Sequence, residues 1–270
     1  MIQKLAEHPY VKIRERVGQR AKSAGWKAGG QIVAAQRGCY ELVWIPEGQL
    51  LMDVPRKKKG RNEDDLSQRT VMISGFYMGR YPVTNEEYGR FLAENPKATE
   101  PEYWSDRQFN LSRQPVVGVS WEDARQYAEW AGLQLPSEAQ WEYACRAGSR
   151  TAYCSGDKEE DLNRVGWYEK NSGSRLHPVG EKEPNEFGLF DMHGNVWEWV
   201  EDDWHSSYEE APDDGSAWID SPRGSGRVVR GGCWFFPAEH CRSASRGRYE
   251  PGDRNLRLGF RLVLPPGQQS

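Results

Sequence analysis

Cysteines have the most distinctive chemistry in this chain, because a thiolate is both a nucleophile and a ligand for soft metal ions. The five cysteines stand at positions 39, 145, 154, 233 and 241. Their number is odd and no two have the CxxC spacing, which argues against a zinc site or a complete disulfide framework. The five histidines, at positions 8, 177, 193, 205 and 240, form no helical cluster of metal ligands. The sequence therefore favours buried or reduced thiols.

A carboxylate in Gly194-Asn-Val-Trp-Glu-Trp199 is the best candidate ligand for a hard cation. Side chains alternate along a strand, so Trp197 and Trp199 share one face and Glu198 lies on the other. A carboxylate beside exposed backbone carbonyls can bind calcium. The alternative is that Glu198 accepts hydrogen bonds from the arginine-rich C-terminal strands.

Arginines recur at strand spacing near the C-terminus, beside aromatic residues and glycines: Arg242, Arg246, Arg254 and Arg261. A planar guanidinium pairs bidentately with a carboxylate or stacks on an indole. We expect these side chains to hold irregular loops in place rather than to bind a ligand.

The composition predicts an irregular, aromatic-rich fold. With 270 residues the chain fits one large domain, or a domain with an extension. Twelve Trp, 12 Tyr, 28 Gly and 16 Pro indicate an aromatic core, turn-rich backbone and short helices and sheets. No apolar run reaches the roughly 18 residues of a membrane span, and the N-terminus lacks the apolar core of a signal peptide. We expect a cytoplasmic protein without membrane contact.

Charge divides the chain into two parts. Residues 1–40 hold eight Lys or Arg against two Glu, which leaves 28 basic and 38 acidic residues, about −10, in the remainder. Residues 1–38 are predicted to form a basic, partly helical extension, with helical character at 3–22 and a linker near 23–30. It could dock on the acidic body, on a partner or on nucleic acid. So few charges without an interleaved motif disfavour nucleic acid.

Local signals place several elements. We predict strands at 41–46 and 71–79, a helix behind Thr84 or Asn85, and a helix behind Ser120. A third helix starts with a capping box of Ser137 and Gln140 and ends at Gly148. Short strands are expected around 197–202, 227–231, 242–248 and 258–264, and a solvated charged loop at 56–65.

Five motifs appear in order along the body of the chain: Pro82-Val-Thr-Asn85, Pro115-Val-Val-Gly-Val-Ser-Trp121, 134–144, 185–199, and Arg230-Gly-Gly232 through Gly259-Phe-Arg261. On these motifs, residues 39–270 resemble the formylglycine-generating-enzyme (sulfatase-modifying factor) type of C-type lectin fold. The resemblance implies an α+β domain with little regular secondary structure, short antiparallel strands and two or three peripheral helices.

The resemblance also bears on metals. In the oxidase branch of the family, two cysteines five residues apart bind copper. Aligned from Gly231-Gly232, the second is Cys241, but the first position is Phe236. We therefore expect no copper and no catalysis, unless a folded-back loop brings Cys233 to Cys241. The family's calcium site implies Glu198 as side-chain ligand, with carbonyls near Gly194 and Val196.

The tail resembles that of the variable proteins of diversity-generating retroelements. Once the scaffold positions are set aside, the candidate ligand-binding residues in loops 227–263 are Cys233, Phe235, Phe236, Pro237, His240, Ser245, Gly247, Tyr249, Gly252, Leu256 and Arg257. The expected function is non-catalytic binding of a protein or other macromolecule, since exposed aromatics on a rigid frame make good anchors.

Three alternatives stay open. Phe235 and Phe236 could fold inward and fill the emptied copper pocket. The protein could be an enzyme, or an enzyme subunit, of the same superfamily with altered chemistry. It could also be an interaction module of a defence or signalling complex, with residues 1–38 as its docking element.

Overall fold

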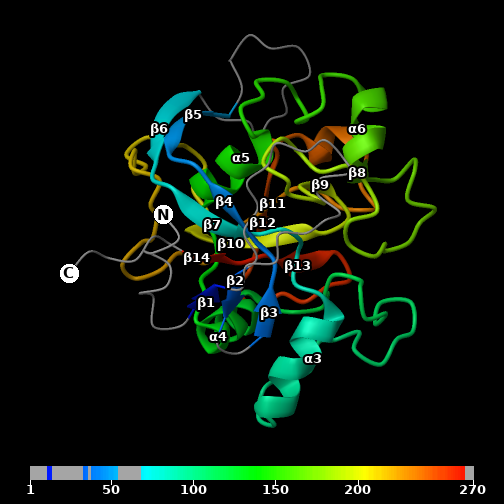
Figure 1. Ribbon diagram of the computed structural model, residues 1–270. Coiled ribbons are helices and arrows are strands. Elements are labelled where there is room, and N and C mark those ends of the chain that lie inside the picture. Colours follow the sequence, from blue (N-terminus) through cyan, green and yellow to red (C-terminus); the bar gives the residue numbers. More distant parts are fainter. Residues whose placement is uncertain (1–10, 14–32, 36–37, 54–67, 265–270) are drawn as a thin grey trace.

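The structure is a computed structural model, which describes residues 11–13, 33–35, 38–53 and 68–264. Its largest sheet has four strands in the order β12-β11-β10-β13. These strands are β10 (Trp197–Asp203), β11 (Arg227–Arg230), β12 (Arg246–Tyr249) and β13 (Leu258–Phe260). Strands β10, β11 and β12 pair antiparallel, whereas β13 runs parallel to β10. The sheet crosses the middle of the molecule (Figure 1).

Smaller sheets surround this one. Strands β14 (Val263–Leu264), β7 (Phe76–Gly79) and β4 (Leu42–Ile45) form a three-stranded sheet. Two-stranded sheets are β5 (Gly48–Met52) with β6 (Arg69–Ile73), and β8 (Gly166–Trp167) with β9 (His193–Gly194). The second of these pairs is parallel, so the expectation of antiparallel strands holds for most of the pairs but not for all.

Four helices lie among the described residues: α3 (Asn85–Glu94), α4 (Trp121–Ala131), α5 (Glu138–Arg146) and α6 (Glu159–Val165). Figure 1 shows α3 and α6 far apart, at the lower and upper right ends of the molecule. A 3-10 turn, η1 (Ala238–Cys241), interrupts the C-terminal loops. No helix in the described parts of the chain has both the length and the apolar composition needed to cross a bilayer.

The predicted helix starts are confirmed. Thr84, Ser120 and Ser137 each cap a helix and form a capping box, and the partner of Ser137 is Gln140 as expected. Helix α5 ends as predicted: its C-cap is Ala147, which adopts the left-handed conformation with φ of 46°, and Gly148 follows as the C′ residue. Helix α6 carries no side-chain cap bond and was not predicted.

The core is built from aromatic rings, as the composition predicts. Tyr88 and Tyr127 stack with centroids 5.3 Å apart, and Phe260 meets the edge of Tyr127 at 5.4 Å. The hydroxyl of Tyr127 shares a hydrogen bond of 2.7 Å with Tyr40. Helices α3 and α4 thereby join the end of the central sheet.

The N-terminal prediction needs a correction. Residues Val11–Ile13 form strand β1, which pairs with β2 (Val33–Ala35), where helical character was expected. Valine and isoleucine favour strands because their branched side chains restrict χ1, and here strand pairing prevails over the local helical signal. The proposed boundary after residue 38 falls inside β3 (Gly38–Tyr40). The other residues of the extension, and the charged loop 56–65, lie outside the described residues.

Three strand predictions also change. The strand predicted around 258–264 is divided into β13 and β14, which belong to different sheets. The strand predicted at 71–79 is divided into β6 and β7, which pair with different partners, β5 and β4. The strand predicted around 242–248 begins only at Arg246, because residues 243–245 are bent and bond to a buried arginine.

Candidate functional site

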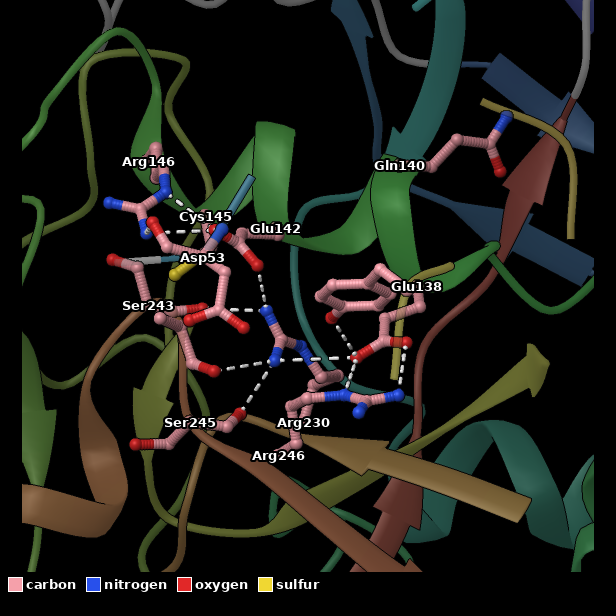
Figure 2. Close-up of polar contacts among 12 residues, drawn as sticks. Asp53, Glu138, Gln140, Glu142, Cys145, Arg146, Arg230, Ser243, Ser245 and Arg246 are labelled. Atoms are coloured by element: carbon pink, nitrogen blue, oxygen red, sulfur yellow. Dashed lines mark hydrogen bonds and ion pairs between the residues drawn. The ribbon is translucent and has the colours of Figure 1, made fainter. Parts of the chain in front are cut away.

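The C-terminal loops are held by Arg230, at the end of β11. Its side chain is fully buried and donates hydrogen bonds of 2.8 to 2.9 Å to the backbone carbonyls of Ser243, Ala244 and Ser245. The same guanidinium pairs with Glu142 of α5. Figure 2 shows these contacts converging on Arg230. The guanidinium of Arg230 thus satisfies the backbone carbonyls of residues 243–245, which have no strand partner in the described part of the chain.

A second buried pair anchors strand β12. Arg246 donates two bonds, of 2.6 and 2.9 Å, to Glu138 of α5, and its guanidinium lies 4.5 Å from the centre of the Trp204 ring. Burial opposes ionisation of Glu138, but the charges of Arg246 and Arg230 prevail and hold the pKa of Glu138 below its ordinary value. The framework role predicted for the arginines is confirmed by this pair.

Glu198 does not fit the role of a calcium ligand. It is fully buried, and Arg261 donates to its two oxygens at 2.6 and 2.7 Å. Trp141 Nε1 donates to one of the same oxygens at 2.7 Å. A cation at this carboxylate would face the guanidinium of Arg261 directly. Glu198 instead accepts hydrogen bonds from a C-terminal arginine, Arg261, as the alternative interpretation of the sequence expected.

The predicted carbonyl ligands, Gly194 and Val196, are buried beside Glu198. Nearby, burial raises the pKa of Asp191 to about 6, and its Oδ1 has no hydrogen-bond partner among the described residues. No group of three or more His, Cys, Asp or Glu suited to a metal ion occurs in the described ranges. Asp191 is thus a buried carboxylic acid in this segment that was not predicted from the sequence.

The predicted ligand-binding residues fall into three groups by burial. Cys233 and Ser245 are buried. Phe235 and Gly252 are exposed, with 53% of Phe235 accessible. The others are half-buried: Phe236, Pro237, His240, Gly247, Tyr249, Leu256 and Arg257. Most of the predicted ligand-binding residues are thus at least partly accessible to solvent, whereas Cys233 and Ser245 are buried in the interior.

Phe235 and Phe236 have different environments, although they are neighbours. Phe236 meets Trp197 edge-on at 6.3 Å and His240 at 5.1 Å, and it packs against the main core. Phe235 points outward and meets Trp234 at 5.3 Å. Arg257 lies over both rings, at 5.6 Å from Phe235 and 5.2 Å from Phe236. Inward folding of both rings, one of our alternatives, is wrong for Phe235.

Two tryptophans of β10, Trp197 and Trp199, pack beneath the C-terminal loops. Trp199 meets Tyr249 edge-on at 6.1 Å, and a Cβ at Gly247 would lie 3.8 Å from the Trp197 ring. Trp197 Nε1 and Arg257 Nε are buried donors without an acceptor among the described residues. The sequence predicted that Trp197 and Trp199 share one face of a strand, and this pattern could have indicated that both pack against the loops. Neither residue was among the predicted site residues.

The loop folds back so that Cys241 lies against Gly232-Cys233. A Cβ at Gly232 would be 2.6 Å from Cys241 Sγ. Burial raises the pKa of Cys233 to about 12, and that of Cys241 well above its ordinary value. Burial thus disfavours the thiolate form of both residues, and the backbone of Gly232 and Cys233 lies against the Cys241 thiol.

Residues 30–265 match the family model of the sulfatase-modifying factor enzyme 1-like domain. The serine/threonine-protein kinase Pkn1 of Chlamydia trachomatis serovar L2 is 33% identical over 242 residues, which cover 83% of this chain and 38% of that protein. The chain thus spans well under half the length of the kinase relatives it matches. The formylglycine-generating enzyme of Mycobacterium tuberculosis is 35% identical over 298 residues, covering 84% of this chain and 98% of the enzyme.

A relative of Bos taurus named inactive C-alpha-formylglycine-generating enzyme 2 is 29% identical, with 84% of this chain and 90% of that protein covered. Among solved structures, PvdO from Pseudomonas aeruginosa has a TM-score of 0.75 at 32% identity, covering 83% of this chain and 94% of PvdO. Treponema denticola variable protein 1 has a TM-score of 0.69 at 24% identity, covering 84% and 96%, and supports the fold alone. The predicted fold is confirmed, and the relatives include proteins named as formylglycine-generating enzymes and one named as inactive.

Proposed function

Because the chain belongs to the sulfatase-modifying factor enzyme 1-like family, we propose that its C-terminal loops carry its function, and that this function is binding of a protein ligand without catalysis. The observation that carries the proposal is the pair Phe235 and Arg257. The exposed ring of Phe235 lies under the guanidinium of Arg257, and Ser172 Oγ holds the adjoining backbone by donating to the carbonyl of Trp234. Such a ring is an anchor of low conformational freedom.

Polar groups beneath the anchor support a ligand that presents acceptor oxygens. Trp197 Nε1 and Arg257 Nε lack acceptors among the described residues and flank Phe236. A buried donor without an acceptor costs about 1 to 3 kcal/mol, and a ligand that supplies a carbonyl oxygen recovers this energy. A protein surface offers such carbonyls beside apolar side chains. Variation of the predicted ligand-binding residues, as in retroelement variable proteins, is part of this proposal.

The test compares affinity captures from a lysate of the source cells by three forms of the full chain. Phe235→Ser removes the anchor. Leu111→Ser is the matched control, because Leu111 is also an exposed apolar residue, at 55% against 53% for Phe235. We expect one or more proteins to be retained by the wild type and by Leu111→Ser, and to be lost with Phe235→Ser. Identical captures by all three forms would refute binding through the loops.

A second candidate, an enzyme of altered chemistry, is favoured by the position of Cys233 beside Cys241. The assay supplies copper(I) and a cysteine-containing sulfatase peptide to the purified protein. Binding without catalysis predicts no aldehyde product above that of Cys241→Ala. Product above this control would establish an oxidase and reverse the main proposal.

The cytoplasmic location and a docking role for residues 1–38 in a defence or signalling complex stay predictions. A deletion of residues 1–38 that preserves captures by the loops, but loses other partners, would separate the two roles.

A further inference from the structure

The side chains of strand β12 point alternately to two different surfaces of the protein. Gly247 and Tyr249 face Trp197 and Trp199, beneath the predicted ligand-binding loops. Side chains alternate along a strand, so Arg246 and Arg248 point to the opposite side. Arg246 packs on Trp204 there, and Arg248 lines a surface hollow of about 380 Å³. The hollow is therefore separate from the loops of the proposed function.

The hollow combines flat aromatic surface with hydroxyls and charges of both signs. The residues that line it are Trp204, His205, Ser206, Ser207, Glu209, Trp218 and Arg248. Aromatic surface with a few polar groups at fixed positions is typical of a small-molecule site.

The aromatic part of the hollow is fixed in place. The imidazole of His205 stacks on Trp218 at 3.5 Å with an interplanar angle of 8°. Its Nδ1 lies 3.0 Å from the carbonyl of Asp203 and its Nε2 lies 3.1 Å from Asp220. His205 covers one face of the Trp218 ring, and Arg246 covers one face of the Trp204 ring, which also packs against the core. Both tryptophans are half-buried and line the hollow. A site that is ordered before binding loses little entropy when a ligand arrives.

The charges in the hollow remain available to a ligand. Arg248 is exposed, and its one hydrogen-bond partner among the described residues is Ser225 Oγ, at 3.1 Å. Glu209 is also exposed, and its one hydrogen bond within the same described ranges runs from its backbone N–H to Ser207 Oγ. An anionic ligand would meet Glu209, and a cationic ligand would meet Arg248. A neutral ligand that both donates and accepts hydrogen bonds satisfies both groups.

We infer that this hollow binds a neutral saccharide. A pyranose ring presents a face of C–H groups that can lie on an indole, and its neighbouring hydroxyls can accept from the guanidinium of Arg248 while donating to the carboxylate of Glu209. The two serine hydroxyls add donors and acceptors at the same surface. An amino acid zwitterion is the main competitor for opposite charges, but it uses the aromatic surface poorly.

The experiment is a titration of the full chain with methyl glycosides of glucose, galactose, mannose and N-acetylglucosamine, followed by amide NMR shifts and calorimetry. At least one glycoside should bind and shift the amides of Trp204, His205 and Trp218. Arg248→Ala and Glu209→Gln should each weaken this binding about tenfold or more, because each removes hydrogen bonds to a charged group. Both residues are exposed, so thermal stability should be unchanged.

Phe235→Ser is the matched control, since it removes an aromatic side chain from the other surface of the sheet. It should leave glycoside binding unchanged, whatever its effect on protein capture. If none of the four glycosides bound at about 50 mM, which is the weakest affinity of interest, the inference would be overturned. The same would follow from glycine or inorganic phosphate binding at the same amides more tightly than any glycoside, or from equal glycoside affinity in the wild type and both variants.

Discussion

Arg261 and Glu198 form a two-point ion pair inside the core, and neither side chain is exposed. Arg261 also donates to the backbone carbonyls of Gly79 and Phe190, so the pair joins the central sheet to β7 and to the segment before β9. The ion pair therefore links three parts of the fold, and we expect Glu198 to contribute to the stability of the protein.

Replacing Glu198 with Ala should destabilise the protein by about 3 to 5 kcal/mol, because Arg261 is left buried without its counter-charge. Urea unfolding followed by tryptophan fluorescence measures this loss. Glu41→Ala is the control, since Glu41 pairs with Arg80 at 3.3 Å at the surface and should cost at most about 1 kcal/mol. Equal effects of the two substitutions would contradict a buried tie.

Removal of calcium with a chelator should leave the melting temperature unchanged, because both oxygens of Glu198 are engaged by Arg261. A ligand that binds only the native state raises stability by mass action, so a bound ion would be revealed by its removal. A fall in melting temperature that added calcium reverses would show that other groups hold an ion. Asp191→Asn would then test the carboxylate whose Oδ1 has no partner among the described residues.

The two neighbouring phenylalanines should respond differently to substitution. Phe235→Ser should change the unfolding free energy by no more than about 0.5 kcal/mol, as exposed substitutions usually do. Phe236→Ser should cost about 1 to 2 kcal/mol, because its ring is half-buried against Trp197. Arg230→Ala should cost about 3 kcal/mol, since it removes the donor to the carbonyls of residues 243–245 and leaves buried Glu142 with Arg146 as its one ion-pair partner among the described residues. A large loss with Phe235→Ser would show that the ring is core.

Asp191 should give the stability a measurable pH dependence. Its pKa is raised in the folded protein to about 6, so its contribution is fully present below the unfolded pKa near 4 and is lost as pH rises through 6. Relative to Asp191→Asn, the wild type should lose up to about 3 kcal/mol between pH 4 and pH 7. Urea unfolding at intervals of pH measures the difference, and parallel profiles for the two proteins would contradict it.

Features fixed by residues close in sequence could be predicted, and those fixed by distant contacts could not. The caps at Thr84, Ser120 and Ser137 depend on residues three positions away, and all three are confirmed. Ordered motifs predicted the fold, because each one marks a fixed position in the family. The different environments of Phe235 and Phe236 depend on Trp197 and Arg257, which the sequence alone does not place beside them.

The contacts of Glu198 also depend on a distant residue. A glutamate at strand spacing can bind either a cation or an arginine, and the local pattern is the same in both cases. The partner of Glu198 is 63 residues away in the chain. The hollow beside Arg248 was missed because its indoles belong to the long segment between β10 and β11, which has little periodicity.

Arg230 recognises the main chain of residues 243–245 and none of their side chains. Every amino acid carries the same carbonyl group, so this grip does not depend on which residues the loop contains. Substitutions within residues 243–245 therefore leave the acceptors of these three hydrogen bonds in place.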